Sequence, residues 1–364
     1  MSVILFIIIL AVLVFVHELG HFLVAKRSGI KVSEFGIGFP PKIWSKQYGE
    51  TLYTLNAIPF GGFVKIMGED ATENPSDLDR ERSMIAKPKY IQIAVLAAGV
   101  VFNLLFAWLL ISIGFMIGQP TGVDYTGPGQ VINPALVITM IAPGSPALSG
   151  GLQPGDVIVG VESGKNKIDE VTPENISKFI NAYGKEGVQF QITRGGDAVP
   201  LKSIVAQKGI VTDKLAVGIS MDVIGTLRLG PVDAFWMGLV KTYDLFVGTA
   251  QGLFSFLGKS IRGDGSLSEV TGPVGIVGVV GQVSQLGFVY VLMFTALISI
   301  NLAVINLFPF PALDGGRILF VIIEAIIGKP IPAKFANYAN GIGFALLILL
   351  MLVVTTHDIW KLFQ

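Results

Sequence analysis

Residues 3–25 form an apolar run in which the only ionisable side chains are His17, Glu18 and His21. As a helix, this run spans about 34 Å, which is long enough to cross a membrane once. Side chains four residues apart share one face of a helix, so both imidazoles can reach a single metal ion. Glu18 lies between them, where it can act on a metal-bound water. The run therefore predicts a transmembrane helix that carries metal ligands.

Composition supports a membrane protein with several spans. Of the 364 residues, 52% are hydrophobic and 14% are charged, and the mean hydropathy is +0.67. This balance is typical of a polytopic membrane protein with some soluble mass. The formal net charge of zero gives no sign of a nucleic-acid partner. The chain has no cysteine and three histidines, so a metal site must use His17 and His21 and needs a carboxylate as well.

Further apolar stretches follow the first one. We expect a polytopic α-helical fold with about four transmembrane helices, in segments 1–25, 90–118, 288–328 and 335–356. Prolines 309 and 311 break the third segment, and an apolar stretch at 318–327 follows the break. A secretory signal peptide is the alternative for the first run, but no basic residue precedes it and no A-x-A site follows it.

The distribution of basic residues predicts the orientation. Segment 26–89 carries ten Lys or Arg, whereas the much longer segment 119–287 carries twelve. Cytoplasmic loops of membrane proteins are enriched in these residues. We therefore expect 26–89 in the cytoplasm, and both termini and 119–287 on the outer side.

Segment 119–225 resembles a PDZ domain of the bacterial, circularly permuted type. It combines strands at 137–141 and 188–194, a helix at 173–183 capped by Thr172, and the sequence G-L-Q-P-G-D-V-I from residue 151. The resemblance implies one PDZ-like extracytoplasmic domain with a groove for extended peptide C-termini. Segment 226–287 is predicted to lie at the membrane surface as an amphipathic segment, with a further crossing at 230–258 as the alternative.

The third metal ligand is predicted in the element N-x-x-P-x-P-x-L-D-G-G, which runs from Asn306 to Gly316. Two prolines end the regular helix, and the glycines permit a tight backbone. Irregular backbone at membrane depth is tolerated where it is buried in protein or lines a cavity. Asp314 is therefore expected to face a pocket at the depth of His17 and His21, in the cytoplasmic half of the membrane.

With both motifs in view, the chain resembles the site-2 protease family of intramembrane zinc metalloproteases, and within it the bacterial sigma-E regulatory group. The resemblance covers nearly the whole length, including 59–67, the PDZ-like domain and 271–276. It departs in two places. Better-known relatives often carry two PDZ domains, and the second crossing usually reads A-G-P where this chain has Ala98-Gly99-Val100, with Asn103 retained.

The resemblance implies a role for each motif residue. His17, His21 and Asp314 would hold Zn2+, and Glu18 would move the proton of the attacking water. Asn306 would bind substrate backbone or cap the helix end at the proline break. Asn103 could contact the same region, but a helix-packing polar bond is the expectation for it.

Segment 26–89 adds a candidate substrate contact. Short β-prone pieces at 51–55 and 62–66 are separated by turn residues, which predicts either a plain surface hairpin or a membrane-associated β-hairpin near the site. In the second case a free strand edge pairs with unwound substrate, and the candidate contacts are Gly61, Gly62, Phe63 and Val64.

The expected activity is zinc-dependent hydrolysis of peptide bonds in the transmembrane segments of single-span proteins, by a multi-pass protein of the bacterial cytoplasmic membrane. The expected substrates have already been cut on the extracytoplasmic side, as in regulated intramembrane proteolysis of anti-sigma factors, or are signal-peptide remnants. The alternative is a non-catalytic membrane-anchored adaptor whose PDZ-like domain binds peptides.

Overall fold

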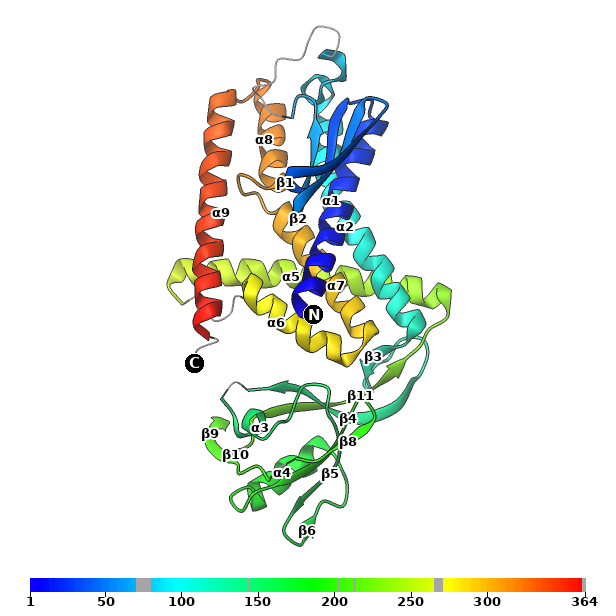
Figure 1. Ribbon diagram of the computed structural model, residues 1–364, viewed down its shortest axis with the longest axis vertical. Helices are drawn as coiled ribbons and strands as arrows, with labels where there is room; N and C mark the ends of the chain where they lie inside the picture. The colour runs from blue at the N-terminus through cyan, green and yellow to red at the C-terminus, as the bar shows by residue number, and fades with distance from the viewer. Residues whose placement is uncertain (70–79, 143, 202, 212–213, 265–270, 362–364) are drawn as a thin grey trace. The chain divides into compact units, whose positions relative to one another are not determined.

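The computed structural model describes residues 1–69, 80–142, 144–201, 203–211, 214–264 and 271–361. The chain divides into two compact units, drawn in Figure 1. The first unit contains 1–112, 235–285 and 290–364, and the second contains 113–234 and 286–289. The predicted segments 26–89 and 226–287 include residues 70–79 and 265–270, which lie outside the described residues.

Helices dominate the first unit. Those that lie wholly or mostly in it are α1 (Ser2–Arg27), α2 (Lys89–Ile117), α5 (Pro231–Arg262), α6 (Pro273–Leu286), α7 (Phe288–Leu307), α8 (Asp314–Ile327) and α9 (Ala333–Lys361). Within the described ranges, four helices are long and apolar enough to cross a membrane: α1, α2, α7 and α9. The expectation of about four spanning helices is thereby confirmed at the level of length and composition. α5 is not one of them, and it runs crosswise to α9 (Figure 1).

Two long strands, β1 (Val32–Tyr48) and β2 (Thr51–Ile66), replace the predicted short pieces. The sequence interpretation was wrong about where the strands end, because Gly38 and Gly61 take positive φ angles of 78° and 111° and bend the strands without ending them. Residues 34–37 pair with 52–55, and residues 32–37 pair with 62–66. In the described chain no further strand pairs with 62–66, which therefore forms an edge.

The β1–β2 hairpin is fastened to α1. The Phe35 ring packs edge-on against the rings of Phe15 and Phe22, with centroids 5.9 and 5.2 Å apart. At the turn between the strands, Glu50 accepts hydrogen bonds from Lys26 (2.8 Å) and Arg82 (2.6 Å). These hydrogen bonds hold the pKa of the Glu50 carboxyl below its usual range. The strand edge consequently has a fixed position relative to the histidine-bearing helix.

The element at 271–276, which the resemblance includes, opens α6. Its backbone N–H at Gly275 donates to Oδ2 of the buried Asp358, at 2.8 Å, and Asp358 lies on α9. A Cβ at Gly272 would lie 2.7 Å from the same oxygen. The glycine thus lets the carboxylate reach the helix N-terminus, where the free N–H groups and the helix dipole favour an anion.

The second unit is built on one β-sheet. Its strands are β3 (Gln119–Gly122), β4 (Val131–Ile141), β5 (Val157–Ser163), β6 (Asn166–Lys167), β7 (Gln189–Arg194), β8 (Asp197–Val199) and β11 (Ile219–Leu227). The order is β3-β11-β4-β5-β7-β8, with β6 on β5, and β9 (Gln207–Val211) pairs separately with β10 (Lys214–Ala216). Helices α3 (Pro146–Ser149) and α4 (Pro173–Tyr183) complete it. The predicted cap of α4 is confirmed, since Oγ1 of Thr172 accepts from the Asn175 N–H at 3.3 Å.

Candidate metal centre and active site

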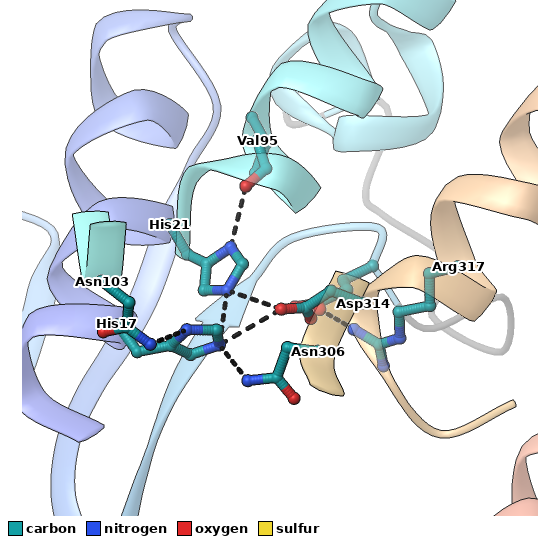
Figure 2. Close-up of polar contacts among 8 residues, drawn as sticks. His17, His21, Val95, Asn103, Asn306, Asp314 and Arg317 are labelled. Carbon is teal, nitrogen blue, oxygen red and sulfur yellow. Dashed lines mark hydrogen bonds and ion pairs between the residues drawn. The ribbon is translucent and has the colours of Figure 1, made fainter. Parts of the chain in front are cut away.

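Three side chains from two distant parts of the chain converge in the first unit. Nε2 of His17 and Nε2 of His21 lie 3.3 Å apart, and Oδ2 of Asp314 lies 3.1 Å from the first and 3.4 Å from the second. Figure 2 shows this triangle, with the histidines on α1 and the aspartate at the start of α8. Both histidines are buried. The structure thus brings together the three residues that the sequence proposes as ligands.

The triangle fits a metal ion. Tetrahedral zinc holds imidazole nitrogens and carboxylate oxygens at about 2.0–2.2 Å, which places neighbouring ligand atoms about 3.3 Å apart. Nδ1 of His21 donates to the Val95 carbonyl at 2.8 Å, so Nε2 of the neutral ring carries a lone pair. Oδ2 of Asp314 is buried and has no hydrogen-bond partner within the described ranges. A lone pair and a carboxylate oxygen this close repel each other unless a cation lies between them.

The backbone break between α7 and α8 delivers Asp314. The turn is so tight that a Cβ at Gly315 would overlap the carbonyl oxygens of Leu307 and Phe308, and a Cβ at Gly316 would overlap that of Phe310. Ala312 takes a positive φ of 75°, and its N–H donates to Oδ1 of Asn340 at 3.1 Å. Glycines are therefore required at 315 and 316 for steric reasons, and they place the carboxylate in the first turn of α8.

One face of α2 supports the two histidines. Val95, Gly99 and Asn103 follow one another at four-residue spacing, and each meets an imidazole. A Cβ at Gly99 would lie 2.5 Å from Cε1 of His17 and would also overlap Nε2 of His21. A Cβ at Gly20 would lie 2.5 Å from the Ala98 carbonyl oxygen, so both glycines are needed for this approach of α1 to α2.

Asn103 does more than the helix packing that was expected of it. Its amide lies 3.2 Å from Nδ1 of His17, and the side chain is fully buried. A histidine that binds metal through Nε2 carries its proton on Nδ1, and an acceptor there fixes the orientation of the ring. Oδ1 of Asn103 has no partner in the described chain, so it can take this proton when the amide turns it toward the ring.

We expect Asn103→Ala to weaken zinc binding by about 10- to 100-fold, because the His17 ring loses the partner that orients it. Competition between the purified variant and a chromogenic chelator measures this affinity. The matched control is Asn301→Ala, which removes a membrane-helix amide that accepts from Thr249 at 3.3 Å. Equal zinc affinity of Asn103→Ala and the wild type would contradict the assignment.

Glu18 and the strand edge share a cavity with the metal triangle. The cavity has a volume of about 320 Å³, and its lining includes His17, Glu18, His21, Asp314 and residues 62–66. A Cβ at Gly62 would lie 3.2 Å from Cγ of Glu18, so the strand passes directly beside the glutamate. The carboxylate, the candidate ligands and a strand edge that pairs with no further described strand therefore face one space.

Only some of the other candidates from the sequence line this cavity. Gly62, Phe63 and Val64 line the cavity, whereas Gly61 does not and instead packs against the Phe39 ring. The Asn306 amide lies 3.5 Å from Nε2 of His17. Its place beside the ligands is visible in Figure 2, and its role in substrate binding stays a prediction.

Sequence reasoning missed two charged residues of the cavity, Glu69 and Arg317. They form an ion pair although 248 positions separate them. Arg317 follows Asp314 by three residues, so the helical spacing of α8 was the one available signal for it.

Comparison with known proteins agrees with the two motifs. The model of peptidase family M50 matches residues 5–350. A protein of Clostridium perfringens (strain 13 / Type A), CPE1693, is 36% identical over 350 residues that cover 95% of each chain. "Zinc metalloprotease RasP" of Geobacillus kaustophilus is 31% identical and covers 100% of this chain and 98% of its own. The protein of that name from Shouchella clausii is 30% identical over 99% of each chain. The chain therefore belongs to peptidase family M50, the site-2 protease family.

Proposed function

We propose that this protein is a zinc-dependent intramembrane endopeptidase that cuts transmembrane segments of single-span membrane proteins. The observation that carries the proposal is the triangle of His17, His21 and Asp314, in one cavity with Glu18, on a scaffold of apolar helices long enough to span a membrane. Family M50 relatives are named zinc metalloproteases, and the donor set of two imidazoles and a carboxylate is the one zinc hydrolases use. The metal assigned to the site is therefore Zn2+.

His17, His21 and Asp314 would hold the zinc ion, which would supply a Lewis acid for the scissile carbonyl and for a bound water. The protein residues supply the remaining chemistry. Glu18 removes a proton from the attacking water and returns one to the leaving nitrogen. Asn103 and the Val95 carbonyl hold the two imidazoles through their Nδ1 atoms, which keeps both Nε2 lone pairs directed at the site.

Substrate backbone pairs with the edge at 62–66. A transmembrane helix has its carbonyls hydrogen-bonded internally, so it must unwind before Glu18 and the metal can act on a peptide bond. The released segment finds unpaired strand groups at this edge, which compensates the lost helical hydrogen bonds. Gly62, Phe63 and Val64 are the contacts assigned here, and the Asn306 amide donates to a substrate carbonyl beside the metal.

The second unit is assigned as a single PDZ-like domain that binds peptide C-termini on the outer side. What supports this is a groove of about 290 Å³ in that unit, lined by α4 and by residues 214–221. The N–H of Leu215 donates to Oδ1 of Asn181 on α4 at 3.1 Å, which ties the strand to the helix. Such a groove suits an extended peptide that adds to the strand, and it would select substrates already shortened by an earlier cut.

We place the protein in the bacterial cytoplasmic membrane, with the metal site in the cytoplasmic half and the second unit outside. The distribution of Lys and Arg supports this orientation. α5 is assigned to the outer membrane surface, since it exposes the apolar side chains of Trp236 and Phe254 and also carries charged residues.

Removing the metal tests the proposal. We expect a strong chelator to abolish cleavage of a single-span reporter by the purified protein in liposomes, and Zn2+ to restore it, because the ligand set is specific for zinc rather than for hard cations. Gel electrophoresis of the reporter measures cleavage, and Mg2+ serves as the control addition. Full cleavage after metal removal, verified by elemental analysis, would exclude the proposed chemistry.

A further inference from the structure

Two cavities adjoin at the metal site. One is the 320 Å³ cavity that contains the metal triangle, and the other is a cavity of about 430 Å³ between α2, α8 and the start of α9. Among the described lining residues, the two cavities share Glu69 and Arg317 and no others. The ion pair between these side chains thus forms the wall that separates the metal cavity from its neighbour.

Each partner of this pair is fixed to a different part of the site. Glu69 lies just after β2, and its N–H donates to the Ile66 carbonyl at 3.1 Å, so its position follows that of the strand edge. Arg317 lies one helical turn after Asp314, and its N–H donates to the Leu313 carbonyl at 3.2 Å. The pair therefore joins the substrate-holding strand to the helix that supplies the third ligand.

The positive charge of Arg317 lies in the metal cavity and therefore needs a fixed partner. Arg317 lines the same cavity as Glu18 and Asp314. A cation without a fixed partner there would be drawn to the base and the metal ligand. Glu69 is the ion-pair partner of Arg317, and Figure 2 shows Arg317 beside Asp314 on α8.

We infer that the Glu69–Arg317 ion pair is a positioning latch. It keeps the strand edge at its working distance from α8 and closes the metal cavity toward the neighbouring cavity. Neither residue touches the reacting atoms. This inference rests on the proposed protease function, because it concerns where the substrate strand is held.

A double-mutant cycle measures the coupling between Glu69 and Arg317. Glu69→Gln and Arg317→Gln should each lower kcat for the single-span reporter by about 10- to 100-fold, since a small displacement of reacting groups costs this much. The zinc content should stay unchanged. The kcat of the double variant should lie within about threefold of the lower of the two single-variant values, because both substitutions break the same contact. If the loss of kcat in the double variant equals the product of the two single losses, the residues act separately and the latch is overturned.

A second readout does not depend on activity. The chain has no cysteine, so Val64→Cys introduces a unique thiol in the metal cavity. In a Glu18→Gln background, Glu69→Gln should raise the rate of its labelling by a polar maleimide several-fold. The matched control is Glu324→Gln on α8, which breaks the ion pair of Glu324 with Lys89. Of the two cavities, Glu324 lines only the second. Glu324→Gln should leave the labelling rate unchanged. In the active protein it should also leave kcat unchanged.

The latch and the proposed function fail in different ways. Cleavage by Glu18→Gln at the wild-type rate would remove the protease proposal. If Glu18→Gln is inactive as expected, an unchanged kcat or an unchanged labelling rate in Glu69→Gln overturns the latch alone.

Discussion

Replacing Glu18 with glutamine is expected to lower the rate of reporter cleavage by about 100- to 10,000-fold, the range that a positioned general base contributes. Glutamine has nearly the shape of glutamate but cannot take a proton from water at neutral pH. Since Glu18 is not one of the three ligands, the variant should keep its zinc. Cleavage in liposomes measures the rate, and elemental analysis of the same preparation measures the zinc content.

The matched control for this substitution is Glu174→Gln on the second unit. Its carboxylate is exposed and pairs with Lys178 within α4, outside the metal cavity. This variant should cleave at the wild-type rate. Substantial cleavage by Glu18→Gln would mean that another residue activates the water.

Replacing Gly99 with alanine is the second change with a large expected effect. The added methyl group would lie 2.5 Å from Cε1 of His17, which is inside any permitted contact distance, and it would also strike the His21 ring. The rings must turn or α2 must withdraw, and either movement removes the hydrogen bonds to Val95 and Asn103. We expect zinc affinity to fall by at least about 10- to 100-fold, as when such orienting contacts are lost, with a matching loss of cleavage.

Gly341→Ala is the control for Gly99→Ala. Gly341 also lies in a helix long enough to span the membrane, α9, but nothing lies within 4 Å of the position its Cβ would take. Alanine has a higher helix propensity than glycine, so the substitution should not disturb the helix. Zinc binding and cleavage should therefore be unchanged. Normal zinc affinity in Gly99→Ala would show that α2 does not set the geometry of the histidines.

The parts of this protein that a sequence can predict are those set by local spacing. The four-residue interval between His17 and His21 and the apolar run around them specify a helix with two imidazoles on one face. The proline and glycine pattern before α8 indicates a backbone break, and the Asp314 position follows from it. Thr172 before Pro173 predicts the start of α4 for the same kind of local reason.

Apart from the meeting of Asp314 with the two histidines, the contacts between elements could not be predicted in this way. Asn103 reads as one polar residue in an apolar helix, and only the packing of α2 on α1 brings it to His17, 86 positions away. The same holds for Gly99, whose sequence context gives no sign that it touches both imidazoles. Strand ends were misjudged because glycines at 38 and 61 act here as bends, although the same residues usually signal turns.

The position of the cut in a substrate tests the central claim most directly. Purified wild-type protein and Glu18→Gln, each in liposomes, receive a single-span reporter that has been shortened on its outer side, and mass spectrometry of the products locates the scissile bond. We predict a bond within the transmembrane segment, in its cytoplasmic half, and no cut by Glu18→Gln. A wild-type cut only in the soluble flanks, or the same intramembrane cut by both proteins, would contradict the account.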